Sequence, residues 1–116
     1  MAAYQPDRGD FVHASFTPHA GHEQAGRRPA LILSPLNFNI GTGLAFACPV
    51  TNTDQNGPFE VPVPPSAKLT GVILTAHLRS IDWLARDVEF HSHAPNETVL
   101  EVLGRIEAIL ELSLDP

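Results

Sequence analysis

The densest group of chemically useful side chains lies in residues 21–29, which read Gly-His-Glu-Gln-Ala-Gly-Arg-Arg-Pro. This glycine-bounded segment combines an imidazole, His22, and a carboxylate, Glu23, with the guanidinium groups of Arg27 and Arg28. Imidazole and carboxylate suit proton transfer, and a guanidinium offers a rigid fork of donors for a phosphate. Arg28 precedes a proline, which holds its backbone extended. The segment is typical of a phosphate-handling site, and a plain salt bridge from Glu23 to either arginine is the alternative.

Other catalytic motifs are missing from the sequence. It contains no Gly-x-Ser-x-Gly elbow, no phosphate-binding glycine loop and no paired-cysteine metal site. Its six histidines include two close pairs, His19 with His22 and His91 with His93. Since no third ligand clusters with either pair, we expect no metal or other cofactor, with a zinc site as the alternative. The simplest interpretation of His91 and His93 is an exposed strand face.

The composition predicts one folded domain spanning residues 1–116. Apolar residues make up 43% of the chain and charged residues 17%, which excludes a disordered protein. The longest apolar stretch, residues 44–50, is too short to cross a membrane, and the first ten residues lack the apolar core of a secretory signal. A lone cysteine, Cys48, cannot form an internal disulfide. We therefore expect a cytoplasmic protein.

Negative charge concentrates in the last third of the chain. The net charge is −6, but residues 1–82 carry five basic and six acidic side chains, whereas residues 83–116 carry two and seven. The body is therefore almost neutral. It can still hold a local cationic groove for nucleic acid.

Short apolar runs separated by turn residues predict a mainly β fold. Residues 11–16 alternate as a half-buried strand does, and further strands are expected at 29–33, 44–51, 59–63, 71–77 and, less regularly, 88–90. Residues 34–39 are expected to form a turn or a short 3₁₀ piece, and residues 81–86 one helical turn carrying Trp83. Pro49 removes a ladder donor, so its end of the strand should lie at an edge or be bulged.

One helix is expected, at the C-terminal end. Val99, Leu103, Ile106 and Leu110 repeat at helical spacing, and Leu100 and Ile109 widen the apolar stripe. Pro95 suits the first helical position. Five or six strands followed by one amphipathic helix predict a small, partly open antiparallel barrel with a helix laid across it.

Nearly the whole chain, from residue 7 to about 110, resembles the MazF/PemK family of toxins. The resemblance is carried by Gly9-Asp10-Phe11-Val12, Phe16-Thr17-Pro18, Gly21 to Ala30, Leu33-Ser34-Pro35, Phe38-Asn39, Thr42-Gly43, Cys48-Pro49-Val50-Thr51, Pro58-Phe59-Glu60-Val61, Gly71-Val72, Arg79-Ser80-Ile81-Asp82-Trp83, Ala85-Arg86 and Glu101-Val102-Leu103. The Glu-Gln-x-Gly-x-Arg-Pro pattern is specific to this family.

The resemblance implies an SH3-like antiparallel barrel with a C-terminal helix, and the toxin half of a toxin–antitoxin pair. Most members are metal-independent, sequence-specific endoribonucleases that cut single-stranded RNA. The substrate's own 2′-oxygen attacks, which leaves a 2′,3′-cyclic phosphate and a 5′-hydroxyl. Members act as homodimers whose interface grooves bind RNA, and a cognate antitoxin occupies the same grooves. Since the attacking group belongs to the RNA, no protein nucleophile is needed.

The same resemblance implies a role for each matching residue. Arg28 aligns with the catalytic arginine and would stabilise the charged phosphorane. Thr51 aligns with the catalytic threonine, although it could merely cap a turn. Glu23 aligns with a glutamate that acts as a base or orients the arginine, and His22 with a histidine used in part of the family, unless it is an ordinary loop residue. Arg79 is a candidate phosphate contact.

Three further residues, Arg27, Arg86 and His77, are candidates for RNA binding. Arg27 would share a cationic groove with Arg28 and Arg79. Arg86 would touch RNA or instead pair with Asp82 or Asp87.

His77 belongs to a departure from the family pattern, because this chain reads Ala76-His77 where many members carry Asp-Gln. Either Glu23 with His22 does the work of the missing aspartate, or His77 has taken it over, or activity is weakened. Two alternatives to a nuclease therefore stay open. One is a non-catalytic toxin that binds a protein target, as gyrase-poisoning relatives of the fold do. The other is a protein that only sequesters antitoxin.

Overall fold

The computed structural model describes residues 3–16, 27–53 and 57–111. The elements are listed in chain order: β1 (Asp10–Ser15), β2 (Arg27–Ile32), α1 (Leu36–Thr42), β3 (Leu44–Thr51), β4 (Glu60–Pro62), the 3₁₀ turn η1 (Pro65–Ala67), β5 (Val72–Leu74), the 3₁₀ turn η2 (Thr75–His77), β6 (Arg79–Asp82), β7 (Glu89–His93) and α2 (Asn96–Leu110). The chain is thus mainly β with a C-terminal helix, as the sequence predicts.

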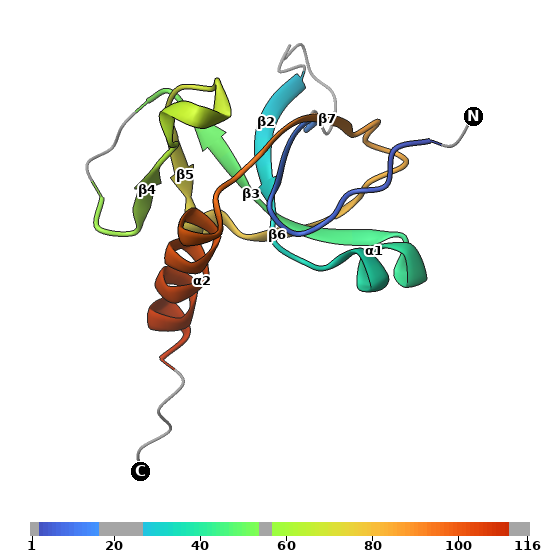
Figure 1. Cartoon of the computed structure of the whole chain (residues 1–116). Helices are drawn as coiled ribbons and strands as arrows, with labels where there is room; N and C mark the ends of the chain where they lie inside the picture. Colours follow the sequence, from blue (N-terminus) through green and yellow to red (C-terminus); the bar gives the residue numbers. More distant parts are fainter. Residues whose placement is uncertain (1–2, 17–26, 54–56, 112–116) are drawn as a thin grey trace.

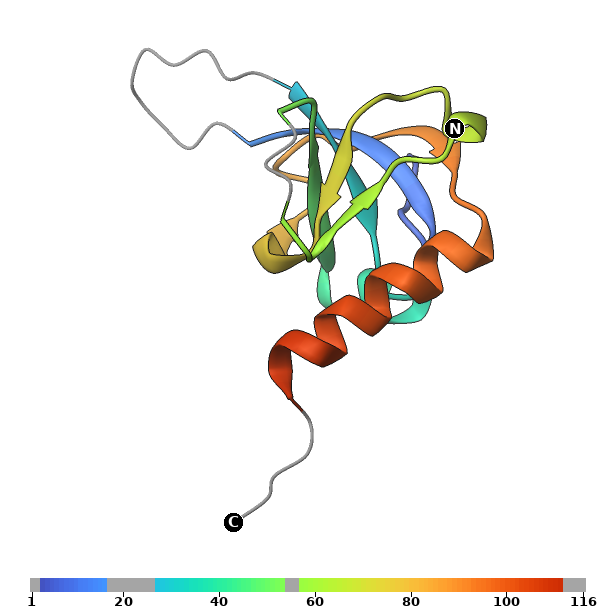
Figure 2. The same cartoon turned by 90° about the vertical axis from the view of Figure 1, so that its left-hand side faces the viewer.

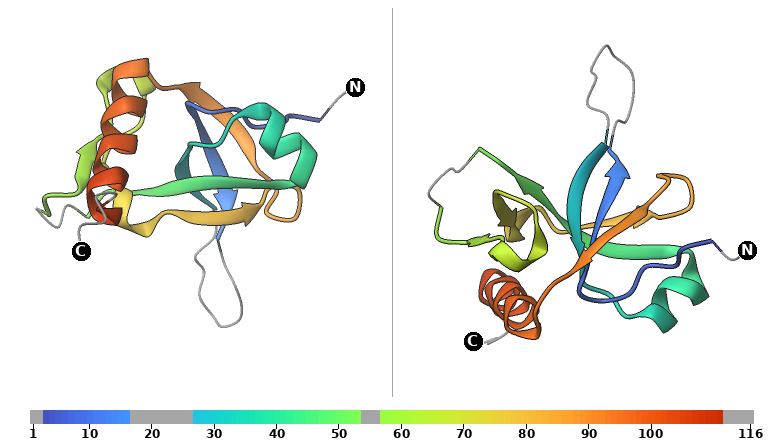
Figure 3. Two further views of the ribbon diagram at one scale, coloured as in Figure 1. Left: turned by 90° about the horizontal axis from the view of Figure 1, so that it is seen from below. Right: turned by 45° about the horizontal axis from the view of Figure 1, so that its top comes forward.

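The strands form one antiparallel sheet in the order β4-β5-β3-β2-β1-β7, and β6 also pairs with β3. The sheet bends strongly, so that β4 and β5 turn away from β1 and β7 (Figure 1, Figure 3). The prediction of a small, partly open barrel is confirmed. The described residues contain seven strands rather than five or six, because the expected helical turn at 81–86 begins as strand β6.

Strand alternation divides the interior into two apolar clusters. Val12, Ala30 and Ile32 face a cluster that also contains Trp83 and Val88. The alternate residues, such as Leu31, face a second cluster that includes side chains of α2. The first half of β1 and the second half of β2 are therefore packed on both sides, whereas the Arg27 end of β2 is exposed.

Helix α2 lies across one side of the barrel, next to β4 and β5 (Figure 2). Val99 and Val102 are buried in the second cluster, and Leu103 and Ile106 pack against it. The helix begins one residue after Pro95. The apolar stripe is narrower than expected, because Leu100 is 68% exposed. Within the described residues, no helix is long and apolar enough to cross a membrane.

Three local predictions are corrected or narrowed by the structure. Residues 36–42 form an α-helix rather than a turn, and the Asp7 carboxylate, distant in sequence, accepts the Leu36 N–H at 2.9 Å. Pro49 pairs with Ala30 of β2 and so does not lie at an edge, but the other expected alternative, a local irregularity, fits, because the ladder on the opposite side of β3 is interrupted there as β5 replaces β6. The expected helical turn at residues 81–86 is shorter, because residues 81 and 82 belong to β6. A tight turn that carries Trp83 follows, and in it the Arg86 N–H donates to Asp82 O.

A buried polar network fixes α1 to the barrel. Asn39 is fully buried, and its amide donates to Pro6 O at 2.8 Å and to Ser34 O at 2.9 Å. Its Oδ1 accepts the Ser34 hydroxyl at 2.6 Å, and its carbonyl accepts the Trp83 indole N–H at 3.0 Å. The N-terminal segment, α1 and the turn after β6 are therefore joined through this one residue. Cys48 is a small core residue, as predicted, and burial raises its pKa to about 12.

Arg27 ties the end of β2 to the segment before β7. Its guanidinium donates to the carbonyls of His13 and Asp87, and contacts the carboxylates of Asp87 at 3.6 Å and Glu89 at 3.2 Å. The guanidinium of its neighbour Arg28 has no hydrogen-bond or ion-pair partner within the described part of the chain. The two arginines thus differ in what they contribute to folding.

Asn39→Ala should lower the free energy of unfolding by about 3 kcal/mol, because it leaves several buried groups without partners. Urea denaturation of the variant and the wild type measures this loss. Asn37→Ala is the matched control, since Asn37 is exposed on the same helix, and it should change stability by less than about 0.5 kcal/mol. Equal stability of the two variants would contradict the network.

Arg27→Ala should lower stability by about 1 kcal/mol, because the partly exposed ion pairs are screened and the carbonyl bonds add little more. Arg28→Ala should leave the melting temperature unchanged within about 1 °C, since no described contact is lost. Thermal unfolding of both variants tests the difference. A larger loss for Arg28→Ala than for Arg27→Ala would show that Arg28 has a structural role.

Candidate active site

Arg28 lies on β2 at the end of the sheet from which residues 17–26 leave. It is exposed, and it pairs in register with Ala14 of β1. Because side chains alternate along a strand, Arg28 points to the same face as Ala30 and Ile32, at the end of their apolar cluster. The strand therefore fixes the direction of a guanidinium that no described carboxylate neutralises.

Thr51 ends β3 and lies on the same face as Arg28. The β2–β3 register pairs Ala30 with Pro49. Because side chains alternate along β3, Thr51 points to the same side of the sheet as Ala45 and Ala47, the side that Arg28 also faces. The Thr51 hydroxyl oxygen accepts the Thr53 N–H at 3.2 Å. That bond uses only its acceptor side, and within residues 3–16, 27–53 and 57–111 no acceptor takes its hydrogen, which can be donated to a ligand.

A glycine makes room for the end of β3. Gly71 has φ +118°, and a Cβ there would lie 2.3 Å from the Thr51 carbonyl oxygen. Only glycine allows β5 to start this close to Thr51. Gly71 is thus a positioning residue for the candidate site.

Two more arginines gather around one aromatic ring on this face. The guanidinium carbon of Arg79 lies 5.1 Å from the centroid of the Phe16 ring, and that of Arg86 lies 5.9 Å from it. Arg86 also donates to Ser15 O at 3.1 Å. We call Phe16, Arg28, Thr51, Arg79 and Arg86 the arginine face. Phe16 is the member that sequence reasoning missed, because its partners are far away in the chain.

Arg27 does not share this face. Neighbouring residues of a strand point in opposite directions, and Arg27 contacts Asp87 and Glu89 on the other side of β2. The structure therefore brings Arg28 and Arg79 to one face and separates Arg27 from them. The alternative pairing of Arg86 with Asp82 or Asp87 is not found among the described contacts.

His77 closes η2, beside a pocket of about 180 Å³. Both Ala76 and His77 are exposed, and Thr75 beneath them is buried, with its hydroxyl donated to Phe59 O. Since Arg79 starts the next strand, His77 lies within two residues of the arginine face. His22 and Glu23 lie outside the described residues, so their placement does not enter the geometry.

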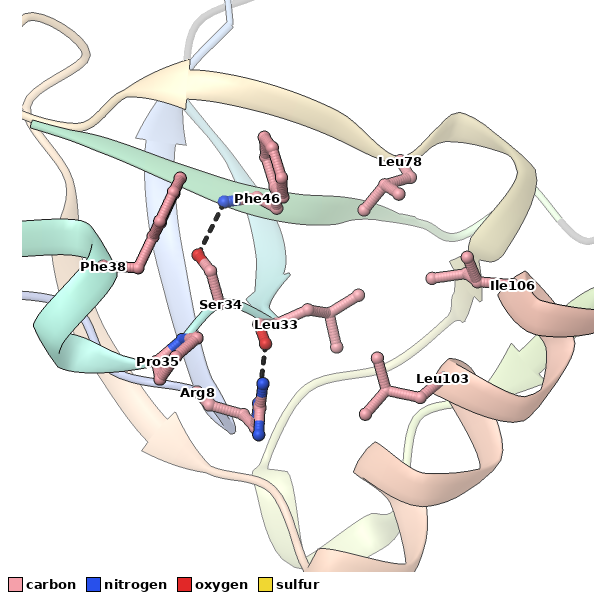
Figure 4. Close-up of a pocket in the computed structure, with 9 residues that line it drawn as sticks. All are labelled: Arg8, Leu33, Ser34, Pro35, Phe38, Phe46, Leu78, Leu103 and Ile106. Carbon is pink, nitrogen blue, oxygen red and sulfur yellow. Dashed lines mark hydrogen bonds between the residues drawn. The ribbon is translucent and has the colours of Figure 1, made fainter. Parts of the chain in front are cut away.

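The largest pocket described, about 400 Å³, is apolar and lies between α1, β3 and α2 (Figure 4). Phe38, Phe46, Leu78 and Ile106 point into it, and the rings of Phe38 and Phe46 lie 5.5 Å apart. Its polar groups are already bonded, Arg8 to Leu33 O and Ser34 to the Phe46 N–H. Such a pocket offers apolar packing and no chemistry.

The arginine face is the part of the described structure that can act on a phosphodiester. It combines three arginine cations, a hydroxyl donor and an aromatic ring, which suit a phosphate and a stacked base. No group of three or more metal-ligating side chains occurs in residues 3–16, 27–53 and 57–111.

Comparisons with known proteins show the family of this chain. The family described as PemK-like, MazF-like toxin of type II toxin–antitoxin system matches residues 7–110. The chain is 42% identical to the endoribonuclease toxin MazF of Escherichia coli K12 over 110 residues, 95% of this chain and 98% of that protein. It is 38% identical to the endoribonuclease PemK of Escherichia coli over 108 residues, 90% of this chain and 81% of that protein.

Solved structures give the same result. A crystal structure of MazE–MazF (Form-II) from Deinococcus radiodurans superposes with a TM-score of 0.90 at 48% identity, and covers 96% of this chain and all of that one. A crystal structure of MazF (Form-I) from the same organism gives 0.86 at 47% identity, with 95% of this chain and 100% of that chain covered. With its fold, its motifs and nearly its whole length shared, this chain belongs to the PemK-like, MazF-like toxin family of type II toxin–antitoxin systems.

Proposed function

We propose that this chain is an endoribonuclease toxin that cuts single-stranded RNA at specific sequences without a metal ion. The substrate's 2′-oxygen attacks the adjacent phosphorus, the 5′-oxygen leaves, and the products end in a 2′,3′-cyclic phosphate and a 5′-hydroxyl. The observation that carries the proposal is the exposed Arg28 guanidinium, which contacts no described carboxylate and lies on the same side of the sheet as Thr51.

Arg28 and Thr51 supply the donors that this reaction needs. Negative charge grows on the non-bridging phosphate oxygens as the phosphorane forms, and a fixed guanidinium stabilises it more there than in the ground state. The Thr51 hydroxyl donates to a second phosphate oxygen. A base must take the 2′-hydroxyl proton and an acid must protonate the leaving 5′-oxygen. We assign these roles to Glu23 and His22, which precede Arg28 by a few residues.

The remaining side chains of the arginine face hold the RNA strand. Arg79 and Arg86 contact phosphates, and Phe16, between them, offers a ring on which a base can stack. His77 lies next to Arg79 and reads a neighbouring base or assists in proton transfer. Contact between Arg27 and RNA stays a prediction. It requires the RNA to pass around the Arg27 end of β2 to the other face of the sheet.

Ala76 bears on the rate rather than on the type of reaction. A family member with aspartate here would have one more carboxylate near the phosphate. This chain keeps Arg28, Thr51 and Glu23, so the groups that stabilise charge and move protons are retained. A protein that only sequesters antitoxin is the outcome if these groups are insufficient.

Two protein partners are part of the proposal. The MazE–MazF structures from Deinococcus radiodurans pair a related toxin with another protein, and we infer a cognate antitoxin for this chain. We also infer a homodimer. Phe46 and Leu78, 41% and 39% exposed at the rim of the apolar pocket, supply surface for a second copy. Because Arg79 follows Leu78, such a dimer would extend the arginine face across the interface.

The proposed active unit is a single toxin domain over the whole chain, acting on messenger RNA in the cytoplasm. The family match of residues 7–110 supports one domain.

Arg28→Ala should lower the rate of RNA cleavage by at least 100-fold, because it removes the main stabilisation of the phosphorane. The assay incubates a long single-stranded RNA with antitoxin-free toxin in EDTA and maps the cut ends, including a test for cyclic phosphate. Discrete cuts by the wild type, lost in the variant, are the expected result.

Arg105→Ala is the matched control, since this arginine lies on α2 and is paired with Glu101. It should cut RNA at the wild-type rate. A folded wild-type protein that cuts nothing in EDTA would contradict the nuclease and favour a protein that only binds antitoxin. Cleavage that survives in Arg28→Ala would show that Arg28 is not catalytic.

Arg79→Ala should weaken RNA binding and reduce its dependence on salt. Each phosphate contact on single-stranded nucleic acid contributes about 0.7 to the slope of log affinity against log salt concentration. The slope for the variant should therefore be smaller by about 0.7. Fluorescence anisotropy with an RNA lacking the attacking 2′-hydroxyl measures this slope from about 50 to about 300 mM KCl, which brackets the physiological ionic strength. An unchanged slope would exclude Arg79 as a phosphate contact.

A further inference from the structure

Two histidines that the proposed nuclease mechanism does not use meet on the face of the sheet opposite the arginine face. The His13 ring, on β1, and the His91 ring, on β7, have centroids 5.1 Å apart and planes inclined by 73°. Both side chains are half-buried. Strand β7 lies at an edge of the described sheet, where β1 is its only partner. The contact between the two rings therefore lies on the seam that holds this edge strand in place.

A β-bulge places His91 on this face. The β1–β7 register pairs Phe11 with Ser92 and Val12 with Phe90, so His91 is the extra, unpaired residue of β7. Without the extra residue, the register at Ser92 would continue with His91 opposite Val12, on the other face of the sheet. Bulges re-aim side chains in this manner. The effect of this irregularity is to bring two titratable rings together.

A third cationic group lies beside the pair. The Arg27 guanidinium donates to the carbonyl of His13 at 3.0 Å, and strand alternation puts both side chains on the same face. The neighbouring carboxylates are those of Asp87 and Glu89, and both already contact Arg27, at 3.6 Å and 3.2 Å. A positive charge on His13 would therefore compete with Arg27 for these carboxylates.

The surroundings of His91 offer no compensation for a positive charge. His91 Nδ1 lies 2.9 Å from the hydroxyl of Ser92, which donates to Ala67 O. Lys68, which follows Ala67 at the end of η1, is exposed and is itself a cation. Within residues 3–16, 27–53 and 57–111, no carboxylate forms an ion pair with His91.

The edge-to-face contact favours rings of which at least one is neutral. The positive edge of one ring then meets the negative face of the other. A single proton is tolerated, because a cationic ring over a neutral one is a cation–π contact. A second proton removes the neutral face. It leaves two imidazolium rings and the Arg27 guanidinium at one seam, where like charges repel.

The titration of His13 agrees with this geometry. Burial lowers the pKa of His13 below its ordinary value of 6.5, with contributions in the same direction from His91 and Arg27 and an opposing one from Glu89. The folded chain therefore binds a proton at His13 less readily than the unfolded chain does. The stability that the neutral ring supports is fully present above the ordinary pKa and is lost as the pH falls through the folded-state pKa.

His93, two residues further along β7, has different surroundings. Its Nδ1 lies 3.0 Å from Oδ1 of Asp10, whose carboxylate is buried. The other oxygen of Asp10 accepts the Tyr4 hydroxyl and, at 3.1 Å, the N–H of Asp7. A proton on His93 creates an ion pair with this carboxylate. Acid should therefore strengthen the C-terminal end of β7 while it weakens the bulged middle of the strand.

We propose that the contact between His13 and His91 is an acid-sensitive latch at the edge of the sheet. It holds β7 against β1 while a neutral ring is present, and the bulged middle of β7 separates from β1 when both rings are protonated. The pair of His93 with Asp10 keeps the end of β7 attached, so the opening is local. Since β7 leads directly into α2, acid loosens the connection between this helix and the barrel.

The first test compares melting temperatures of the antitoxin-free, full-length toxin without RNA, so its outcome is independent of the proposed nuclease. Measurements at about pH 7.5 and about pH 5 bracket the ordinary pKa of histidine. The acid-induced fall in melting temperature should be smaller than in the wild type by at least about 3 °C in His13→Gln and in His91→Gln, because each variant removes the pair. Falls that agree within about 1 °C in all three proteins overturn the proposal.

His93→Gln is the matched control on the same strand. It keeps both rings of the latch and removes the ion pair that acid strengthens, so its melting temperature should fall further than that of the wild type on acidification. A purely structural effect of the substitution would lower the melting temperature equally at both pH values. A fall equal to or smaller than that of the wild type overturns the proposed division of roles along β7.

Hydrogen exchange of the wild type decides the matter should the histidine variants fail to fold. After correction for the intrinsic exchange rate, the protection of residues 88–92 should fall by at least about fivefold at about pH 5, while that of β3, inside the sheet, changes by less than about twofold. Unchanged protection of residues 88–92, or an equal change in β3, overturns the proposal.

Discussion

The register of β2 between β1 and β3 decides where the functional side chains lie. Ala30 and Ile32 fill one apolar cluster and Leu31 the other, so a slip by one residue would exchange both sets and bury a guanidinium. This apolar requirement, rather than any contact of the arginines, holds Arg27 and Arg28 on opposite faces. Packing on both sides of β2 therefore positions the candidate site, which lies at the Arg27 end of that strand.

The fold was largely predictable because its signals are local. Residues 44–51 are a short, almost entirely apolar run, which predicts a strand with the bounds that β3 has, and the helical period from Val99 to Leu110 predicts α2. What the sequence could not predict has non-local causes. Helix α1 depends on a carboxylate from Asp7, and Pro49 is tolerated inside the sheet because β3 changes neighbours there. No window of sequence contains either fact.

The candidate site was less predictable than the fold. Arg28 stood out from its position before a proline, but Thr51 was named only through the family resemblance, and only strand alternation in the folded sheet brings the two to one face. Adjacent arginines suggested one shared groove, yet strand alternation separates them. Phe16 could not be recognised as a site residue from the sequence, because the guanidinium groups that lie over its ring come from residues more than sixty positions away.

A net charge of −6 and a site for RNA are compatible because the charges are sorted in space. Asp87 and Glu89 pair with Arg27 on one side of β2, while Glu101 and Glu107 are exposed on α2. No described carboxylate approaches Arg28 or Arg79. The acidic groups therefore neutralise a structural arginine and leave the arginine face cationic.

The same sorting gives the sheet two chemically different faces. On one, guanidiniums that contact no described carboxylate attract a polyanion. On the other, Asp87 and Glu89 pair with Arg27 and neutralise it. Because apolar clusters pack against both sides of the sheet, the two faces keep a fixed relation to each other.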